Sequence, residues 1–185
     1  TPSNSSAASD VYKRQIKKLW RFIMIRHATQ NDLPKILDIY NHAILNTTAI
    51  YTYEKTSLLE RKQWLMEKEK QGYPVFIFEI DGRVAGFATY GPFRNFPAYQ
   101  FTVEHSVYVS PYFRHMGIGE KLLSHIIDSA RKEGYKTMVA GIDSENKGSI
   151  YLHKKFNFKY TGTLKDVGYK FNKWLDLDFY QLLLK

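Results

Sequence analysis

The segment that most constrains the fold is "VEHSVYVSPYFRHMGIGEKLLSHIIDSA", residues 103–130. It opens with an apolar, β-branched run that predicts a buried strand and breaks at Pro111. Two glycines, Gly117 and Gly119, follow, and apolar residues then recur with helical spacing. A strand joined in this way to an amphipathic helix predicts that the helix packs on a sheet. A single acid, Glu104, lies within the strand.

The rest of the chain supplies further strands and helices in a clear order. "MIRHAT" predicts a strand, and Asn31 or Asp32 caps a helix with Pro34 in its first turn. Ser57 and Glu60 form a capping box for the next helix, which ends at Gly72. Two apolar runs around Asp81-Gly82 predict a hairpin.

After the glycine segment, "YKTMVAGID" predicts a buried strand and "SENKGSIYLHKKFN" a helix. "FKYTGTLKDVGYKFNKWLDLDFYQLLL" predicts two closing strands around a loop. The predicted order is β-α-α-β-β-β-α-β-α-β-β. It indicates a single domain of mixed α/β (α+β) class, in which helices flank a central twisted mixed sheet.

The composition bounds the kind of protein. At 185 residues, 44% of them hydrophobic, the chain can form one domain with a substantial core. The absence of cysteine excludes disulfides, thiolate zinc sites and a cysteine nucleophile, and favours a cytoplasmic location. No apolar run approaches the ~20 residues of a membrane-spanning helix, so we predict no membrane partner.

The net charge of +9 is partly concentrated at the N-terminus. Residues 1–23 carry a net +4, which leaves 9 − 4 = +5 spread over the rest without one obvious stripe. A field of this kind suits an anionic ligand as well as a polyanion, and we predict no nucleic-acid partner. Because "TPSNSSAASD" is a small polar tract and Met24 can begin the first strand, we interpret residues 1–23 as an extension and residues 24–185 as the domain. A targeting peptide or a basic arm is the alternative.

The glycine turn predicts a site for phosphate. Glycines let a ligand approach the main chain, and the following helix presents unpaired amides and its positive dipole end. Neither the Walker pattern nor the Rossmann pattern is complete here, because Glu120-Lys121 follows the second glycine and a third glycine is missing. The alternative is that the glycines only ease a turn between a strand and a helix.

Arg-x-x-Gly-x-Gly between "VYV" and an amphipathic helix resembles the acetyl-CoA motif of the GCN5-related N-acetyltransferases, the GNAT superfamily. The resemblance runs from about Ile25 to Leu184. "GYPVFIFEIDGRVAGFATYG", "TVEHSVYV", "NKGSIYLHKKFNF" and "VGYKFNKWLDLDFYQL" are similar to the branch that acetylates phosphinothricin and methionine sulfoximine or sulfone. The resemblance implies a GNAT fold, acetyl-CoA as co-substrate, and transfer of acetyl to the α-amine of a small amino acid or analogue.

It also implies where the cofactor binds. The backbone of Val107, Tyr108 and Val109 would pair with the pantetheine arm, and Arg114 would add charge near the phosphates. Asn146 matches an asparagine that contacts the cofactor in the family, and an ordinary polar residue beside a helix cap is the alternative. The main-chain amides expected to wrap the pyrophosphate belong to His115, Met116, Gly117, Ile118, Gly119 and Glu120.

Acetyl transfer to an amine requires removal of a proton from the ammonium group and protonation of the departing thiolate. A charged residue in a strand is unexpected unless it faces solvent or a site, and the resemblance makes Glu104 the general base. Many members of the superfamily have, at the position of His153, a tyrosine that acts as general acid, and this branch has histidine there. The resemblance therefore implies that His153 is the general acid. A capped or core histidine is the alternative. His105 should point to the opposite sheet face from Glu104, so it is a weak catalytic candidate.

The loop "GPFRNFPAYQF" is predicted to line the acceptor pocket, with Arg94 pairing with a substrate carboxylate. The branch's substrate-contact segment falls on Pro97, Ala98 and Tyr99; exposed aromatics packing over the sheet are the alternative. Phosphinothricin-resistance enzymes have an arginine aligned with Phe96, whereas the arginine at position 94 is the pattern of the methionine-sulfone type. "NTTAIYTYE" is a second candidate wall.

The leading functional hypothesis is an acetyl-CoA-dependent N-acetyltransferase that transfers acetyl directly in a ternary complex, because no cysteine can form an acetyl-enzyme. The alternatives are a polyamine, an antibiotic or a protein N-terminus as acceptor, or a non-catalytic module that binds CoA or associates with nucleic acid. No metal site is indicated, because the histidines do not converge by spacing. A homodimer is expected from the resemblance and from the aromatic-rich C-terminal strands.

Overall fold

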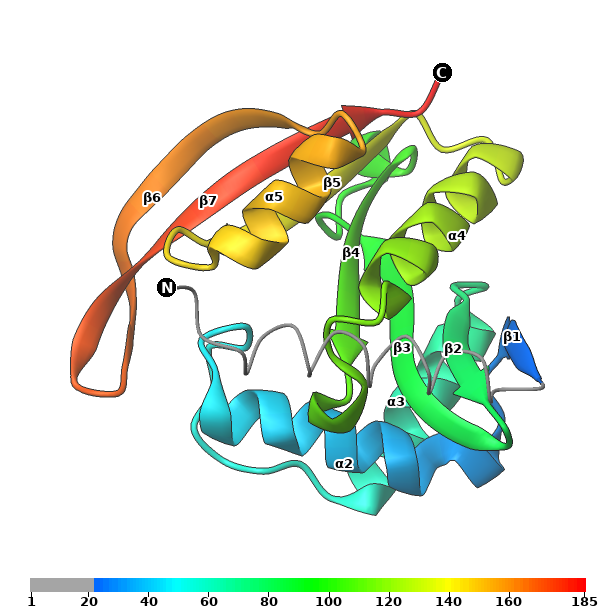
Figure 1. The fold of residues 1–185 in the computed structure, drawn as a ribbon. Coiled ribbons are helices and arrows are strands. Elements are labelled where there is room, and N and C mark those ends of the chain that lie inside the picture. The colour runs from blue at the N-terminus through cyan, green and yellow to red at the C-terminus, as the bar shows by residue number, and fades with distance from the viewer. Residues whose placement is uncertain (1–21) are drawn as a thin grey trace, which may run out of the picture.

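The computed structural model describes residues 22–185, which form one seven-stranded sheet with helices on both faces (Figure 1). The strands are β1 (Ile23–His27), β2 (Val75–Ile80), β3 (Arg83–Pro92), β4 (Thr102–Val109), β5 (Thr137–Asp143), β6 (Lys159–Lys170) and β7 (Lys173–Leu183). The α-helices are α2 (Leu33–Asn46), α3 (Leu58–Lys70), α4 (Ile118–Lys132) and α5 (Lys147–Lys155). Short 3-10 helices are η1 (Gln30–Asp32), η2 (Pro97–Tyr99) and η3 (Pro111–Phe113). The predicted order of strands and α-helices and the mixed α/β class are confirmed.

The order of strands across the sheet is β1-β2-β3-β4-β5-β7-β6. Every neighbouring pair is antiparallel except β4 and β5, which are parallel. β4 and β5 pair only from Thr102 to Glu104 on one strand and from Thr137 to Val139 on the other. Beyond these residues the two strands continue without pairing, so the sheet opens at its centre.

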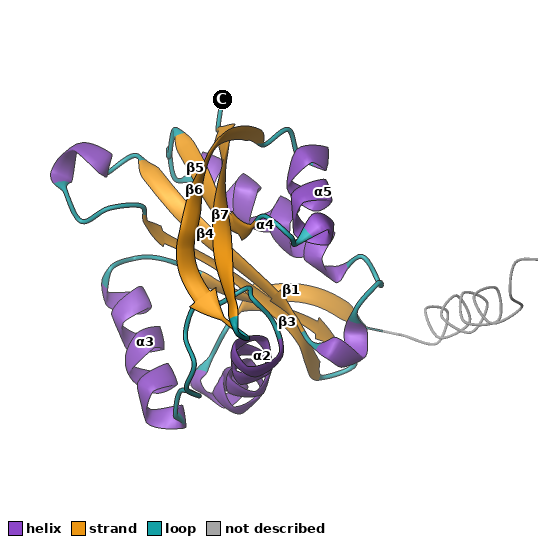
Figure 2. Cartoon of the chain, turned by 90° about the vertical axis from the view of Figure 1, so that its left-hand side faces the viewer, coloured by secondary structure: helices purple, strands orange, loops and turns teal. Residues whose placement is uncertain are grey.

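The helices form two layers, with α2 and α3 on one face of the sheet and α4 and α5 on the other (Figure 2). Strand alternation sends Phe76 and Phe78 of β2 into the core with α4, while Val75 and Ile77 pack against α2 and α3. β2 and β3 are therefore buried on both faces, which explains why their sequences are apolar almost throughout.

Local sequence signals lie where they were predicted. Ser57 and Glu60 form a reciprocal capping box at the start of α3, and Asp81 and Gly82 turn the β2–β3 hairpin with φ of 47° and 75°. Gly117 is the N-cap of α4 with φ 77°, a left-handed conformation that favours glycine. β1 begins at Ile23, one residue before the predicted domain start, and residues 1–21 of the predicted extension lie outside the described residues. In the described part of the chain, no helix is long and apolar enough to span a membrane.

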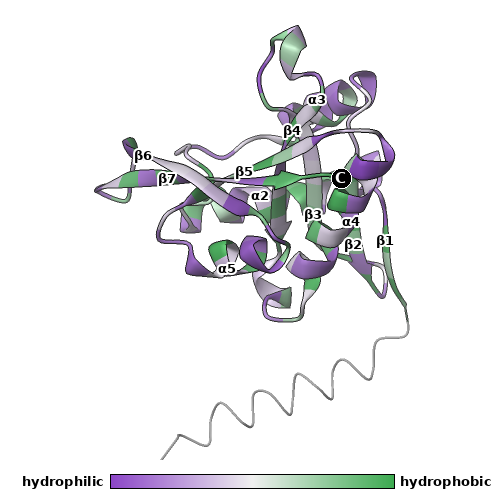
Figure 3. Ribbon diagram, turned by 90° about the horizontal axis from the view of Figure 1, so that it is seen from above, coloured by the Kyte–Doolittle hydropathy of each residue, from purple (hydrophilic) through white to green (hydrophobic). Residues whose placement is uncertain are grey.

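The β6–β7 hairpin extends well beyond the other strands (Figures 1 and 3). The loop after α2 is attached to it, because Nζ of Lys170 donates to the carbonyls of Ile44, Thr47 and Ile50 at 2.5–2.9 Å. The hydroxyl of Tyr53 also donates to the Tyr169 carbonyl at 2.6 Å. Since Lys170 is only 4% exposed, these bonds offset the cost of burying its charge.

Candidate active site

The opening between β4 and β5 leaves one backbone edge of each strand without a partner. β4 pairs with β3 along its whole length, so the edge of residues 105–109 that faces the opening is the free one. β5 pairs with β7 up to Asp143, which leaves its edge from Ala140 onward free in the same way. Unpaired strand edges offer amides and carbonyls to an extended ligand, which can add to a sheet as another strand would.

The turn after β4 leads directly from this opening to the N-terminus of α4. His115 and Gly117 have φ of 61° and 77°, so the main chain between η3 and α4 alternates in and out of the left-handed region. Successive amides in such a turn form a concave donor surface, to which α4 adds its first unpaired N–H groups. A Cβ built on Gly117 would meet nothing within 4 Å, so the space above this turn is open.

Glu104 lies at the last residue pair before the strands separate, on the face that carries α2 and α3. Its Oε1 would be 3.3 Å from a Cβ on Gly141 of β5, so the carboxylate lies across the start of the opening. Burial raises the pKa of Glu104, and the positive charge of Arg94 opposes that rise. A carboxyl whose pKa is raised by burial is suited to accepting a proton near neutral pH.

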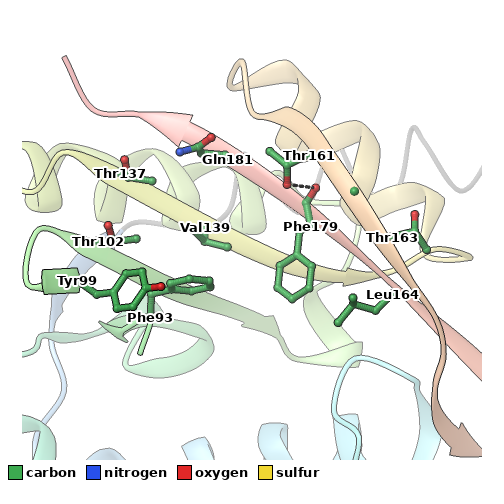
Figure 4. Close-up of a pocket in the computed structure, with 11 residues that line it drawn as sticks. Phe93, Tyr99, Thr102, Thr137, Val139, Thr161, Thr163, Leu164, Phe179 and Gln181 are labelled. Atoms are coloured by element: carbon green, nitrogen blue, oxygen red, sulfur yellow. Dashed lines mark hydrogen bonds between the residues drawn. The ribbon is translucent and has the colours of Figure 1, made fainter. Parts of the chain in front are cut away.

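A hollow of about 460 Å³ lies on the same face of the sheet (Figure 4). Its floor includes Val139, which pairs directly with Glu104, and one wall is formed by Phe93 and Tyr99, whose rings meet edge to face at 5.7 Å. The opposite wall comes from β6 and β7. The complete lining is Phe93, Tyr99, Thr102, Thr137, Val139, Thr161, Gly162, Thr163, Leu164, Phe179 and Gln181.

His153 lies on the other face of the sheet, on α5, and is 5% exposed. Its Nδ1 is 2.7 Å from the Ser149 carbonyl and its Nε2 is 3.2 Å from Nε2 of His105. Glu104 and His105 are consecutive residues of β4, so their side chains leave the strand on opposite faces. The predicted base and the predicted acid therefore approach the opening from opposite sides of the sheet.

The remaining predicted residues differ in their contacts and burial. Asn146 is the N-cap of α5, and its side chain accepts from the Ser149 amide at 3.1 Å. Glu120 forms an ion pair with Lys155 at 2.7 Å. Arg94 donates to the Phe93 carbonyl and its guanidinium lies 4.2 Å from the centre of the Phe93 ring. Ile118 is buried in the core, so only its amide is free to meet a ligand.

Sequence reasoning missed two groups of residues. The first group lines the pocket. Thr102 could have been found, because it lies two residues before Glu104 and strand alternation places it on the same face. The pocket residues of β5, β6 and β7 have no local signal in the sequence. Strand alternation predicts that His105 points away from Glu104, and the structure places it on the α5 face. Its contact with His153, 48 residues away, was not foreseen.

The described residues fit an extended ligand with a phosphate-bearing end. The open strand edge, the turn rich in amides and the α4 N-terminus follow one another along a single path. Within the described residues, no group of three or more His, Cys, Asp or Glu side chains could hold a metal ion. This path, with a carboxyl of raised pKa beside it, is suited to an enzyme that transfers a group from an extended, phosphate-bearing carrier.

The comparisons agree with this class. Residues 25–178 match the family model of the "Acetyltransferase (GNAT) domain", and the chain belongs to this family of acetyl-CoA-dependent N-acetyltransferases. It is similar to the L-methionine sulfoximine/L-methionine sulfone acetyltransferase of Salmonella typhimurium, with 46% identity over 86% of this chain and 94% of the relative. The phosphinothricin N-acetyltransferase of Streptomyces viridochromogenes is more distant, at 36% identity over 87% of each chain.

Solved structures agree as well. An N-acetyltransferase from Staphylococcus aureus Mu50 superposes with a TM-score of 0.88 at 54% identity, covering 89% of this chain and 99% of that one. The putative acetyltransferase yncA from Salmonella typhimurium, determined with its cofactor acetyl-CoA, has a TM-score of 0.86 at 45% identity and covers 88% and 94% of the two chains. The predicted GNAT fold and the resemblance to this branch are confirmed.

Proposed function

We propose that this enzyme acetylates the α-amine of a small amino acid whose side chain ends in a polar group, with methionine sulfone and methionine sulfoximine as model acceptors. The observation that carries the proposal is the position of Glu104, half-buried at the start of the β4–β5 opening and beside a pocket walled by aromatic residues. The higher identity to the methionine sulfone enzyme than to the phosphinothricin enzyme supports this choice of acceptor.

Glu104 acts as the general base in this proposal. The acceptor approaches from the α2 and α3 face, and Glu104 removes a proton from its ammonium group directly or through one water molecule. Acetyl-CoA, when bound, supplies the acetyl group as a thioester. His153, on the opposite face, protonates the departing sulfur, for which its Nε2 must carry a proton and separate from His105.

The residues proposed to hold acetyl-CoA follow the path of the open edge. The backbone of Val107, Tyr108 and Val109 pairs with the pantetheine arm. The amides of residues 115–120 bind the pyrophosphate, and Arg114 adds positive charge there. Asn146 contacts the cofactor through whichever amide atoms its cap bond to Ser149 leaves available.

Arg94 is proposed to bind the α-carboxylate of the acceptor. It is the charged residue whose field acts on Glu104, and a guanidinium that rests on an aromatic ring can rotate to form a two-pronged contact with a carboxylate. Pro97, Ala98 and Tyr99 then close over the acceptor. The hydroxyls of Thr102 and Thr137 and the side-chain amide of Gln181 can donate to sulfone oxygens, whereas those of Thr161 and Thr163 already donate to Phe179 and Asp178.

An acceptor panel tests the proposal. Purified enzyme with acetyl-CoA is offered methionine sulfone, methionine sulfoximine, phosphinothricin, unmodified amino acids, a polyamine and an acceptor that lacks the carboxylate, and free thiol is measured. We expect the highest kcat/KM for the sulfone and sulfoximine and little turnover without the carboxylate. A polyamine that outperforms every amino acid would overturn the acceptor assignment while leaving the family intact.

We also propose a homodimer in a cytoplasmic setting, without nucleic acid as a partner. Large side chains are exposed along the β6–β7 hairpin, and covering them in a dimer would remove apolar surface from water. They are Leu164, Val167, Tyr169, Phe171 and Trp174. Sedimentation of the wild type against Trp174→Lys tests the dimer, and DNA retention that persists after removal of residues 1–21 would contradict the absence of a nucleic-acid partner.

A further inference from the structure

His105 and His153 form a buried pair on the helix face of the opening. Their rings are stacked at 5.1 Å between centroids with an interplanar angle of 18°. Phe158 meets both rings edge to face, at 5.6 Å and 5.0 Å. Two basic side chains buried in direct contact are costly, so the arrangement of their protons must be well defined.

The hydrogen bonds fix that arrangement. Nδ1 of His153 faces the Ser149 carbonyl at 2.7 Å, and a carbonyl only accepts, so this nitrogen carries a proton. In the neutral ring Nε2 of His153 is then an acceptor, and Nε2 of His105 must be the donor in the 3.2 Å contact between them. Nδ1 of His105 is left unprotonated and buried, with no partner among the described residues.

The pair lies where the cofactor's reactive end is expected. His105 is the first residue of β4 beyond its last pairing with β5. His153 reaches the same point from α5, whose Ile150 and Leu152 pack against the core. The two rings therefore meet on the α5 face of the sheet, beside the point where β4 and β5 separate.

We propose that His105 is a positioning residue that donates its Nε2–H to Nε2 of His153 and thereby fixes the ring orientation and the proton position of His153 at the β4–β5 opening. This proposal rests on the proposed function only for its catalytic consequence. A proton on Nε2 of His153 and the bond from His105 exclude each other, so His105 controls when His153 can carry the proton that its acid role requires.

The surroundings contain few other groups that can change the protonation of His153. Burial lowers its pKa and the Ser149 carbonyl raises it, while burial and the neighbouring His153 lower the pKa of His105. Tyr90 of β3 pairs with His105, but its hydroxyl bonds to Ser129 of α4 at 2.9 Å. The next ionisable side chain on β4, Glu104, leaves the strand on the other face.

Nitrogen-15 NMR of histidine-labelled enzyme tests the proton positions without measuring activity. We expect His153 in the Nδ1–H form and His105 in the Nε2–H form at pH 7. In His105→Phe the donor is gone, so the pKa of His153 should rise by about 0.5 to 1, the size of one neutral hydrogen bond. His105→Gln keeps an amide donor at the same reach and should restore most of the original value. The opposite tautomers, or an unchanged His153 pKa in His105→Phe, would overturn the proposal.

Stability and kinetics separate positioning from a merely structural role. In the wild type, Nδ1 of His105 is buried without a partner among the described residues. His105→Phe removes that nitrogen but leaves Nε2 of His153 without its donor, so the number of unpaired buried nitrogens is unchanged and Tm should change by less than about 4 °C. In kcat against pH, the limb on which activity falls with rising pH should move upward by the same amount as the pKa in the NMR titration, with KM for acetyl-CoA within about threefold. His42→Gln on α2 is the control and should change neither the pH dependence of kcat nor the pKa of His153 in the NMR titration.

The two ideas can fail separately. Expected tautomers and an NMR shift, together with an enzyme inactive on every acceptor of the panel, would refute the proposed function and leave the positioning of His153 intact. An active enzyme whose pH limb stays in place while the NMR pKa moves would refute the catalytic role of His105.

Discussion

Glu104→Gln separates the chemistry of the site from its architecture. The change removes the proposed proton acceptor and keeps the shape of the side chain. Among the described residues, no group donates a hydrogen bond to the Glu104 carboxylate, and Arg94 acts on it through charge alone. The amide therefore breaks no hydrogen bond when it replaces the acid.

The expected loss of activity is that of one general base. Such a group contributes about 100- to 10,000-fold, which corresponds to about 2.7–5.4 kcal/mol in the barrier to acetyl transfer. Affinity for acetyl-CoA should stay within about threefold, because the free backbone edge of β4 is unaffected. Since burial disfavours the ionised carboxylate, Tm at pH 7 should be unchanged or higher in the variant.

The assay follows free thiol released with methionine sulfone, together with calorimetric binding of acetyl-CoA and a thermal melt. Glu69→Gln, an exposed residue of α3, is the matched control and should behave as wild type. A loss in kcat below tenfold would remove Glu104 as the base. A loss that follows a lower Tm would mean that the residue is structural.

Three further predictions concern stability and pH. Gly86→Ala should destabilise the fold by about 1–3 kcal/mol in urea unfolding, because its Cβ would lie 2.8 Å from the Tyr108 carbonyl oxygen, whereas Gly148→Ala, with nothing closer than 3.9 Å, should not. Lys170→Met leaves three carbonyls in the last turn of α2 and in the loop after it without their donor, and it should cost about 2–4 kcal/mol by the same measurement. Burial lowers the pKa of Lys68 from 10.5 to about 8, so the folded state binds its proton less tightly than the unfolded state. The wild type should therefore gain stability relative to Lys68→Met between pH 8 and 10.5, and a constant difference would contradict this.

Much of the fold follows from local signals. The capping box at Ser57, the turn at Asp81-Gly82 and the glycine at the start of α4 each specify a backbone conformation through nearby atoms alone. The same holds for the orientation of Glu104 and His105, since successive side chains of a strand face opposite sides. These features were predictable because their physical causes lie within a few residues.

The site needed contacts that no short stretch of sequence encodes. No sequence pattern near Glu104 predicts that β4 and β5 stop pairing at that residue. The register of two parallel strands depends on the helix that connects them, here α4, and on how that helix packs. The pocket wall from β6 and β7 depends in the same way on where the hairpin crosses the sheet.

The sequence by itself determined the order of the elements, the glycine turn that begins α4 and the side of the strand on which Glu104 lies, since propensity, capping and alternation act locally. Only the tertiary structure decided where the sheet opens and which distant residues meet there. The contact between His105 and His153 illustrates the reason. The sequence gives both side chains, but the hydrogen bond between them forms only when folding buries the two rings in contact.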